Sequence, residues 1–166
     1  MFLAIDLKAF NALPADEAEE RLCETFAEPK WAERIAAARP FRDVDALMKA
    51  AEDAWGQLRP DDWVRTFKAH PRIGESGGHA PATSEAEQSG VRKASAATLA
   101  ALATENRRYE ARFGHVFLIA ARGRTVDDIL LAIRQRMNND PVSEVEVAAL
   151  EQRKITRMRL LEMLGE

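Results

Sequence analysis

The sequence predicts an all-α fold, built as a single compact domain of about seven or eight helices. Three observations support this prediction. The 166 residues match the length of one domain, 46% of them are hydrophobic and can form a core, and stretches rich in Ala, Leu, Glu and Arg recur while β-branched residues are sparse. No repeat, linker or low-complexity tract divides residues 1–166. We therefore expect one helical domain over the whole chain.

Proline positions and apolar spacing predict four helices in the first half. Proline is tolerated in the first turn of a helix but interrupts its interior, and apolar residues at i, i+3 and i+4 form a buried face. Asp43 is a suitable N-cap for the third helix. The four helices are expected after Pro14, around Trp31 and Ile35, after Asp43, and from Arg59–Asp62 to near His70.

The second half begins with the longest loop of the chain, residues 71–83, which hold three glycines and two prolines. Long loops in compact domains are often functional. Ser84-Glu85-Ala86-Glu87 has the pattern of a capping box and predicts a helix start. Residues 116–121 form an apolar segment that is either extended or helical. Further helices are expected from about Ser95 to Arg112 with Gly114 past the end, from Thr125 to Met137, and from a cap at Ser143 onward, with Leu150 inward.

Charge, hydropathy and cysteine content argue against several classes of protein. Lys and Arg total 24 against 27 Asp and Glu, so a net charge of −3 predicts no surface for nucleic acid. No apolar run approaches the roughly 20 residues of a membrane span, and the start MFLAIDLKAF is too short and polar for a secretory signal. The single Cys23, expected to be an inert apolar side chain, cannot form an internal disulfide or a multi-cysteine metal site. We expect a cytoplasmic protein without metal, nucleic acid or membrane partners.

His70 is the first candidate for chemistry. It lies where a helix ends and the glycine-rich loop begins, and Pro71 favours an extended backbone at His70. The carbonyl groups at a helix C-terminus favour a protonated imidazole by about 0.3–1 kcal/mol. A histidine biased toward its charged form suits general-acid catalysis. The alternative is that His70 only caps the helix.

The second candidate is the expected helix start at Ser84–Gln88. Backbone N–H groups at a helix N-terminus can bind an anionic or imide-like ligand, and Glu87 and Gln88 would face the same pocket. The alternative is that Glu87 only completes the capping box. If the loop brings this helix start to His70, a cation, an acceptor and backbone donors would surround a small polar molecule.

Other side chains are weaker candidates. His79 lies in the loop, and His115 enters the apolar segment, where a packing role is expected. The histidines lack the spacing of a metal site. Arg122 and Arg159 could each reach inward to a carboxylate, or each could lie on a solvated face.

Four sequence blocks resemble, in this order, the signature of a known family. They are Phe67-Lys68-Ala69-His70-Pro71-Arg72-Ile73-Gly74; Ser84-Glu85-Ala86-Glu87-Gln88; Asn106-x-x-Tyr109-x-x-x-Phe113-Gly114 followed by Phe117-Leu118-Ile119-Ala120-Ala121-Arg122; and Glu151-x-x-Lys154-Ile155-x-x-x-Arg159-Leu160. Over nearly its whole length the chain resembles the 2-oxo-4-hydroxy-4-carboxy-5-ureidoimidazoline (OHCU) decarboxylases of urate breakdown.

The resemblance implies an all-helical, cofactor-free enzyme, often a homodimer, that releases CO₂ from the ureidoimidazoline substrate to give (S)-allantoin. It implies that His70 is the catalytic acid and that Glu87 and Arg159 complete the polar catalytic site. Implied substrate-binding residues are Pro71, Ser84, Glu85, Ala86, Gln88, the backbone of Phe117, Leu118, Ile119, Ala120 and Ala121, and Arg122. Two alternatives stay open: a hydrolase using His70 and Glu87 on a related ureido compound, and a non-catalytic helical interaction module.

Overall fold

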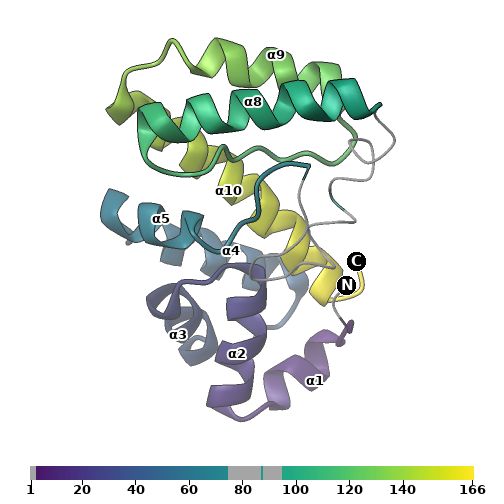
Figure 1. Ribbon diagram of the computed structural model, residues 1–166. Helices are drawn as coiled ribbons and strands as arrows, with labels where there is room; N and C mark the ends of the chain where they lie inside the picture. The colour runs from purple at the N-terminus through teal and green to yellow at the C-terminus, as the bar shows by residue number, and fades with distance from the viewer. Residues whose placement is uncertain (1–2, 75–86, 88–94) are drawn as a thin grey trace. The chain divides into compact units, whose positions relative to one another are not determined.

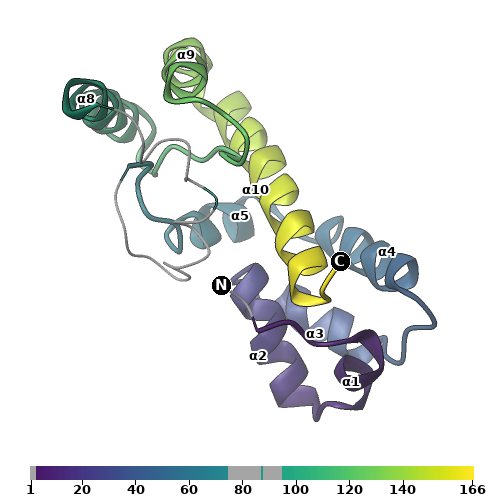
Figure 2. The same ribbon diagram turned by 90° about the vertical axis from the view of Figure 1, so that its right-hand side faces the viewer.

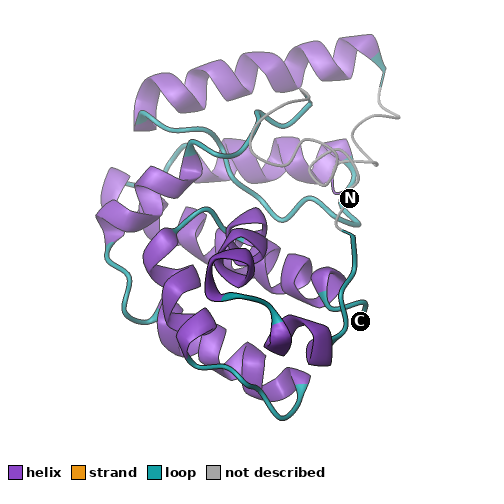
Figure 3. Ribbon diagram, turned by 90° about the horizontal axis from the view of Figure 1, so that it is seen from below, coloured by secondary structure: helices purple, strands orange, loops and turns teal. Residues whose placement is uncertain are grey.

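The computed structural model describes residues 3–74, 87 and 95–166, and within them it contains helices and no strand (Figure 3). The predicted all-α class is therefore confirmed. None of the described helices is both long and apolar enough to cross a membrane. The helices are α1 (Leu7–Ala12), α2 (Ala15–Thr25), α3 (Pro29–Ala37), α4 (Val44–Trp55), α5 (Pro60–Phe67), α8 (Ala96–Phe113), α9 (Val126–Arg136) and α10 (Pro141–Met163) (Figure 1).

The described residues group into two compact units. The central unit comprises residues 63–154, and the terminal unit comprises the residues up to 62 together with 155–166. Helices α5 and α10 each contribute residues to both units. Each unit has its own buried apolar side chains, described separately below.

The terminal unit is organised around aromatic side chains. Helix α3 packs against both α2 and α4 (Figure 2). Trp31 is fully buried, and its indole N–H donates to the carbonyl oxygen of Ala51 at 3.1 Å. The ring of Phe26 meets that of Trp31 edge-on, with centroids 5.3 Å apart, and that of Trp55 at 5.0 Å. The helices predicted around these residues are confirmed.

The N-terminal segment contains a helix that the sequence reasoning missed. Helix α1 begins after Asp6, whose carboxylate accepts a hydrogen bond from the N–H of Ala9 at 2.7 Å. The preceding segment is held where the N–H of Ile5 donates to the carbonyl oxygen of Met163 at 2.8 Å. With six residues, α1 is too short to show a periodic apolar pattern. Its cap, rather than its periodicity, was the available signal.

Asp43 caps α4 as predicted, and we expect its removal to lower the stability of the protein. Its carboxylate accepts from the N–H of Ala46 at 2.8 Å. We expect Asp43→Ala to lower the free energy of unfolding by about 1 kcal/mol, because that N–H loses its acceptor. Asp43→Asn is the matched control, since asparagine caps as well as aspartate and should be nearly neutral. Equal losses in urea unfolding for both variants would contradict the capping role.

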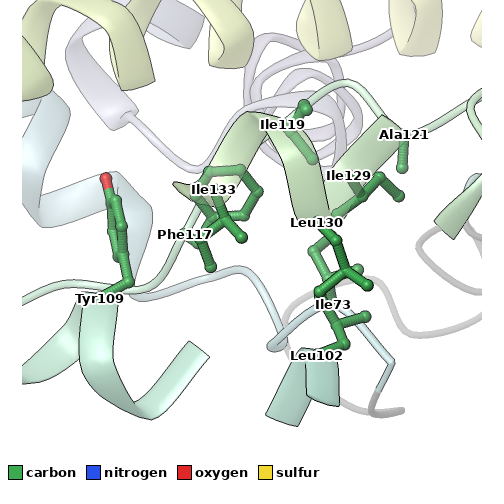
Figure 4. Close-up of a cluster of buried hydrophobic side chains, with 9 residues drawn as sticks. All are labelled: Ile73, Leu102, Tyr109, Phe117, Ile119, Ala121, Ile129, Leu130 and Ile133. Carbon is green, nitrogen blue, oxygen red and sulfur yellow. The ribbon is translucent and has the colours of Figure 1, made fainter. Parts of the chain in front are cut away.

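The central unit has a core of aliphatic and aromatic side chains between α8, α9 and the segment that joins them. Helices α8 and α9 lie side by side (Figure 1). Gly114 ends α8 in the left-handed conformation, with φ at 79°, and Thr125 and Asp128 form a capping box for α9. Residues 116–121 are not helical, which decides the alternative left open above. The core cluster consists of Ile73, Leu102, Tyr109, Phe117, Ile119, Ala121, Ile129, Leu130 and Ile133 (Figure 4).

Two expectations for the last helix were wrong. Helix α10 begins at Pro141 rather than after a cap at Ser143. The carboxylate of Asp140 accepts from the N–H of Ser143 at 3.0 Å and from its hydroxyl at 2.7 Å, and these bonds lower the pKa of Asp140. Proline fits a first helical position, where its missing N–H is not needed. Leu150, expected inward, is 54% exposed.

The buried side of α10 carries polar as well as apolar residues, and Glu144 is the first of the polar ones. The Glu144 carboxylate is fully buried and accepts from the hydroxyl of Tyr109 at 2.6 Å, from Nε of Arg136 at 2.6 Å and from Nδ2 of Asn139 at 2.9 Å. Arg136 also donates to the carbonyl oxygen of Leu118 at 2.6 Å. Burial, followed by the hydrogen bond to Glu144, raises the pKa of Tyr109 well above its ordinary range, so Tyr109 remains a neutral donor.

Candidate functional site

His70 is placed by a turn that follows α5. The helix ends at Phe67, and the N–H groups of Ala69 and His70 donate to the carbonyl oxygens of Thr66 at 3.0 Å and Phe67 at 3.2 Å. His70 is half-buried, and its Nε2 forms a hydrogen bond with Oε1 of Gln152 on α10. The imidazole is thus held by a side chain of another helix as well as by its own turn.

The backbone that follows His70 is attached to α8. Nδ2 of the buried Asn106 donates to the carbonyl oxygen of Ile73 at 2.9 Å. Arg72 forms an ion pair with Glu110 at 2.8 Å. Asn106 belongs to the third sequence block, so this contact joins the first block to the third. Together these interactions hold the residues that follow His70 against α8.

The segment Phe117–Ala121 is neither helix nor strand, and most of its side chains are buried. Its predicted contribution to a ligand is therefore through backbone groups. Several of these groups already have protein partners: the N–H of Ala120 donates to Oε1 of Glu151 at 3.3 Å, and the carbonyl oxygens of Leu118 and Ala120 accept from Arg136 and Arg124. Arg122 is exposed, and it is Arg124 that lies 3.7 Å from the Glu151 carboxylate.

The other predicted site residues are described only in part. Glu87 is helical and half-buried, and it belongs with His70 to the central unit. Arg159 lies in the terminal unit, where it is buried and its guanidinium donates to the carbonyl oxygen of Thr25 at 3.5 Å. The residues that lie outside the described part of the chain are Ser84, Glu85, Ala86 and Gln88, with the loop residue His79.

His115 has the packing role that was expected. Its ring lies among aromatic rings, with centroids 5.2 Å from Phe67, 5.6 Å from Tyr109 and 6.3 Å from Phe113. Its Nδ1 lies 3.0 Å from the carbonyl oxygen of Val116. Across residues 3–74, 87 and 95–166, no group of three or more His, Cys, Asp or Glu side chains is arranged to hold a metal ion.

Cys23 is half-buried on α2, and its surroundings make it a poor nucleophile. Burial raises the pKa of the thiol, and the carboxylates of Glu19 and Glu28 raise it further. A raised pKa means less thiolate at neutral pH, and the thiolate is the reactive form. We expect iodoacetamide to alkylate the native protein more slowly at pH 7.5 than the urea-unfolded protein. Alkylation is followed by mass spectrometry, and equal alkylation rates for the native and unfolded protein would contradict the expected low reactivity of Cys23.

The chain matches a known protein family over most of its length. A family model described as OHCU decarboxylase matches residues 11–161. The chain belongs to the OHCU decarboxylase family. The match spans residues of both units and includes all four sequence blocks.

Relatives of this OHCU decarboxylase family member occur in plants and animals. The chain is 32% identical over 161 residues to the uric acid degradation bifunctional protein TTL of Arabidopsis thaliana, covering 93% of this chain and 49% of that protein. It is 28% identical over 176 residues to the 2-oxo-4-hydroxy-4-carboxy-5-ureidoimidazoline decarboxylase of Amia calva, covering 96% of this chain and 95% of that protein. The chain therefore spans about half the length of the first relative and nearly all of the second.

Two solved structures have the same fold as this chain. A crystal structure of an OHCU decarboxylase in the presence of (S)-allantoin is 32% identical, with a TM-score of 0.77 over 89% of this chain and 99% of that chain. A crystal structure of (S)-allantoin synthase, at 21% identity and a TM-score of 0.72, shares the fold over 96% of this chain and 54% of that chain.

The sequence of this OHCU decarboxylase family member did not lead us to predict the contact between Gln152 and His70. Gln152 follows Glu151 of the fourth block and lies four residues after the buried Ala148 and three before the buried Ile155. This spacing places it on the buried face of α10. A polar side chain on a buried helix face needs a hydrogen-bond partner, and that requirement was the available signal.

Proposed function

We propose that this chain catalyses the decarboxylation of 2-oxo-4-hydroxy-4-carboxy-5-ureidoimidazoline to (S)-allantoin, with His70 as the catalytic acid. The observation that carries the proposal is the family match over residues 11–161, which contains the His70-Pro71 element and the three other blocks. The held, half-buried imidazole of His70 adds support, since a general acid must be both oriented and accessible.

The reaction requires two things of the protein. When the bond between the ring carbon and the carboxylate carbon breaks, CO₂ leaves and the electron pair stays on the ring as an enolate-like system. Backbone N–H groups can stabilise its oxygen without a metal. A proton must then reach the carbon that bears the ureido group from one face, because that step sets the chirality. His70 supplies this proton, and general-acid catalysis is worth about 10²–10⁴ in rate.

The remaining site residues take their proposed roles from the sequence blocks. Glu87 and Arg159 complete the polar site. Substrate contacts are assigned to Pro71, Ser84, Glu85, Ala86, Gln88, the backbone of Phe117, Leu118, Ile119, Ala120 and Ala121, and Arg122. We further propose that the chain functions as a single domain, forms a homodimer, uses no cofactor and works in the cytoplasm, as the resemblance and the single cysteine favour.

The test is a coupled assay that starts from urate and the two upstream enzymes. Released CO₂ and the circular dichroism of allantoin are followed with and without this protein. The proposal predicts faster CO₂ release and an excess of (S)-allantoin. A hydrolase would consume the substrate by another route, without faster CO₂ release, and an interaction module would leave the uncatalysed, racemic reaction unchanged. Either of those two results would overturn the proposal.

A further inference from the structure

Gln152 is the side chain that the structure places against the imidazole of His70. The two residues lie 82 positions apart in the chain, and Oε1 of Gln152 forms a hydrogen bond with Nε2 of His70. Gln152 is only 1% exposed, whereas His70 is half-buried. A buried amide has few alternative conformations, so it can hold a more accessible ring in one orientation.

The neighbouring residue strengthens this arrangement. Glu151 accepts from the N–H of Ala120 at 3.3 Å and from Nζ of Lys154 at 2.5 Å. Two consecutive residues of α10 therefore bind two separate parts of the proposed site. Glu151 holds the segment Phe117–Ala121, and Gln152 holds His70.

The chemistry of an amide makes this contact informative. An amide oxygen accepts hydrogen bonds and does not titrate near neutral pH, so Nε2 of His70 must donate to it. In the neutral ring only one nitrogen carries a proton, and this bond favours Nε2 as that nitrogen. The proton that His70 gives up on going from the charged to the neutral form is then the one on Nδ1.

We propose that Gln152 is a positioning residue for His70, which orients the ring and keeps a proton on Nε2, so that Nδ1 is the nitrogen that transfers the proton. The catalytic consequence rests on the proposed function of His70. The protonation pattern of the His70 ring does not rest on that function, because it can be measured without substrate.

The experiment is nitrogen NMR on full-length protein labelled with ¹⁵N-histidine, recorded through a pH titration. Protonated and unprotonated imidazole nitrogens have well-separated shifts, and His70 is assigned by its loss in His70→Ala. In the wild type we expect the neutral ring to be protonated on Nε2. In Gln152→Leu, which removes the acceptor with little change in size, we expect this preference to weaken. Gln135→Leu is the matched control, since Gln135 is exposed on α9.

A second variant tests the same contact through charge. Gln152→Glu keeps an oxygen acceptor but adds a negative charge beside the ring, which should raise the pKa of His70 by about one unit or more. The charged pairs formed by residues close to His70 and Gln152 in the sequence, Arg72–Glu110 and Lys154–Glu151, keep both side chains in every variant. A neutral ring protonated on Nδ1 in the wild type, or an unshifted pKa in Gln152→Glu, would overturn the proposal.

Kinetic measurements distinguish a residue that positions His70 from one that only stabilises the fold. Gln152→Leu should lower kcat by up to about a hundredfold with little change in KM, and should have no further effect in a His70→Ala background. An additional loss in that background would show that Gln152 does not act through His70. If the wild type has no decarboxylase activity, the proposed function fails, while the NMR result still decides the assignment of Gln152.

Discussion

Replacing His70 by alanine should leave the protein folded and reduce its decarboxylation to the uncatalysed reaction. We expect kcat to fall by about 10²–10⁴-fold and the allantoin formed to be racemic. The physical reason is that the proposed mechanism assigns to His70 the proton that is delivered to one face of the substrate ring. The measurement is the coupled urate assay, read by CO₂ release and by circular dichroism of the product.

The matched control is Lys68→Ala, because Lys68 lies two residues before His70 and its side chain is exposed. It alters the same turn without a proposed contact to the ring, so its rate and product chirality should stay close to wild type. Thermal unfolding of both variants excludes a loss of structure as the cause. If His70→Ala still produced (S)-allantoin at the wild-type rate, His70 would have no part in the reaction.

The largest loss of stability is expected from Glu144→Ala. Glu144 is fully buried and accepts hydrogen bonds from Tyr109, Arg136 and Asn139. Removing it leaves the Arg136 charge in the interior, where that side chain is 10% exposed. Breaking a buried pair from one side costs about 3–5 kcal/mol. We therefore expect the free energy of unfolding in urea to fall by about that amount.

The control for this loss is Glu146→Ala, on the exposed side of the same helix. It also replaces a glutamate by alanine in α10, and its effect should lie within about 0.5 kcal/mol. Glu144→Gln should fall between the two, since it keeps an oxygen acceptor and loses the charge. Equal unfolding midpoints for Glu144→Ala and Glu146→Ala would contradict a stabilising role for the buried network.

Local rules were sufficient for much of the fold. The caps at Asp43 and Thr125 and the left-handed Gly114 occur where the residue types predicted them. These features depend on hydrogen bonds within one helical turn, so a single stretch of sequence contains all the partners. The all-α class followed from composition and periodicity in the same way.

The last helix shows where periodicity fails. Leu150 was expected to be buried because it is apolar, yet it is 54% exposed, while Glu144 and Gln152 are buried. Burial of a charged or amide side chain is favourable only when partners from distant segments satisfy it. Tyr109, which lies 35 positions from Glu144, and His70, which lies 82 positions from Gln152, are such partners, and the residues next to Glu144 and Gln152 in the sequence do not indicate them.

Some residues of the candidate site could be predicted from the sequence, and others could not. His70 could be singled out by its position between a helix end and a glycine-rich loop, and the sequence blocks named the other residues. Gln152 was not singled out: its place on the buried face of α10 indicates that it needs a partner, but that partner, His70, lies 82 positions away in the sequence. For Arg122 the sequence left two alternatives open, reaching inward to a carboxylate or lying on a solvated face; the side chain is exposed, and Arg124 lies near Glu151.

The decisive measurement is a titration of ¹⁵N-histidine-labelled protein with (S)-allantoin, because it reports whether the product binds against the proposed acid. The chain has three histidines, so each ring can be followed separately. We predict that the ring nitrogens of His70 shift in a saturable manner, and that those of His115, packed among aromatic rings, do not. Saturable binding of (S)-allantoin that leaves the His70 ring unperturbed would contradict the assignment of this imidazole to the reaction.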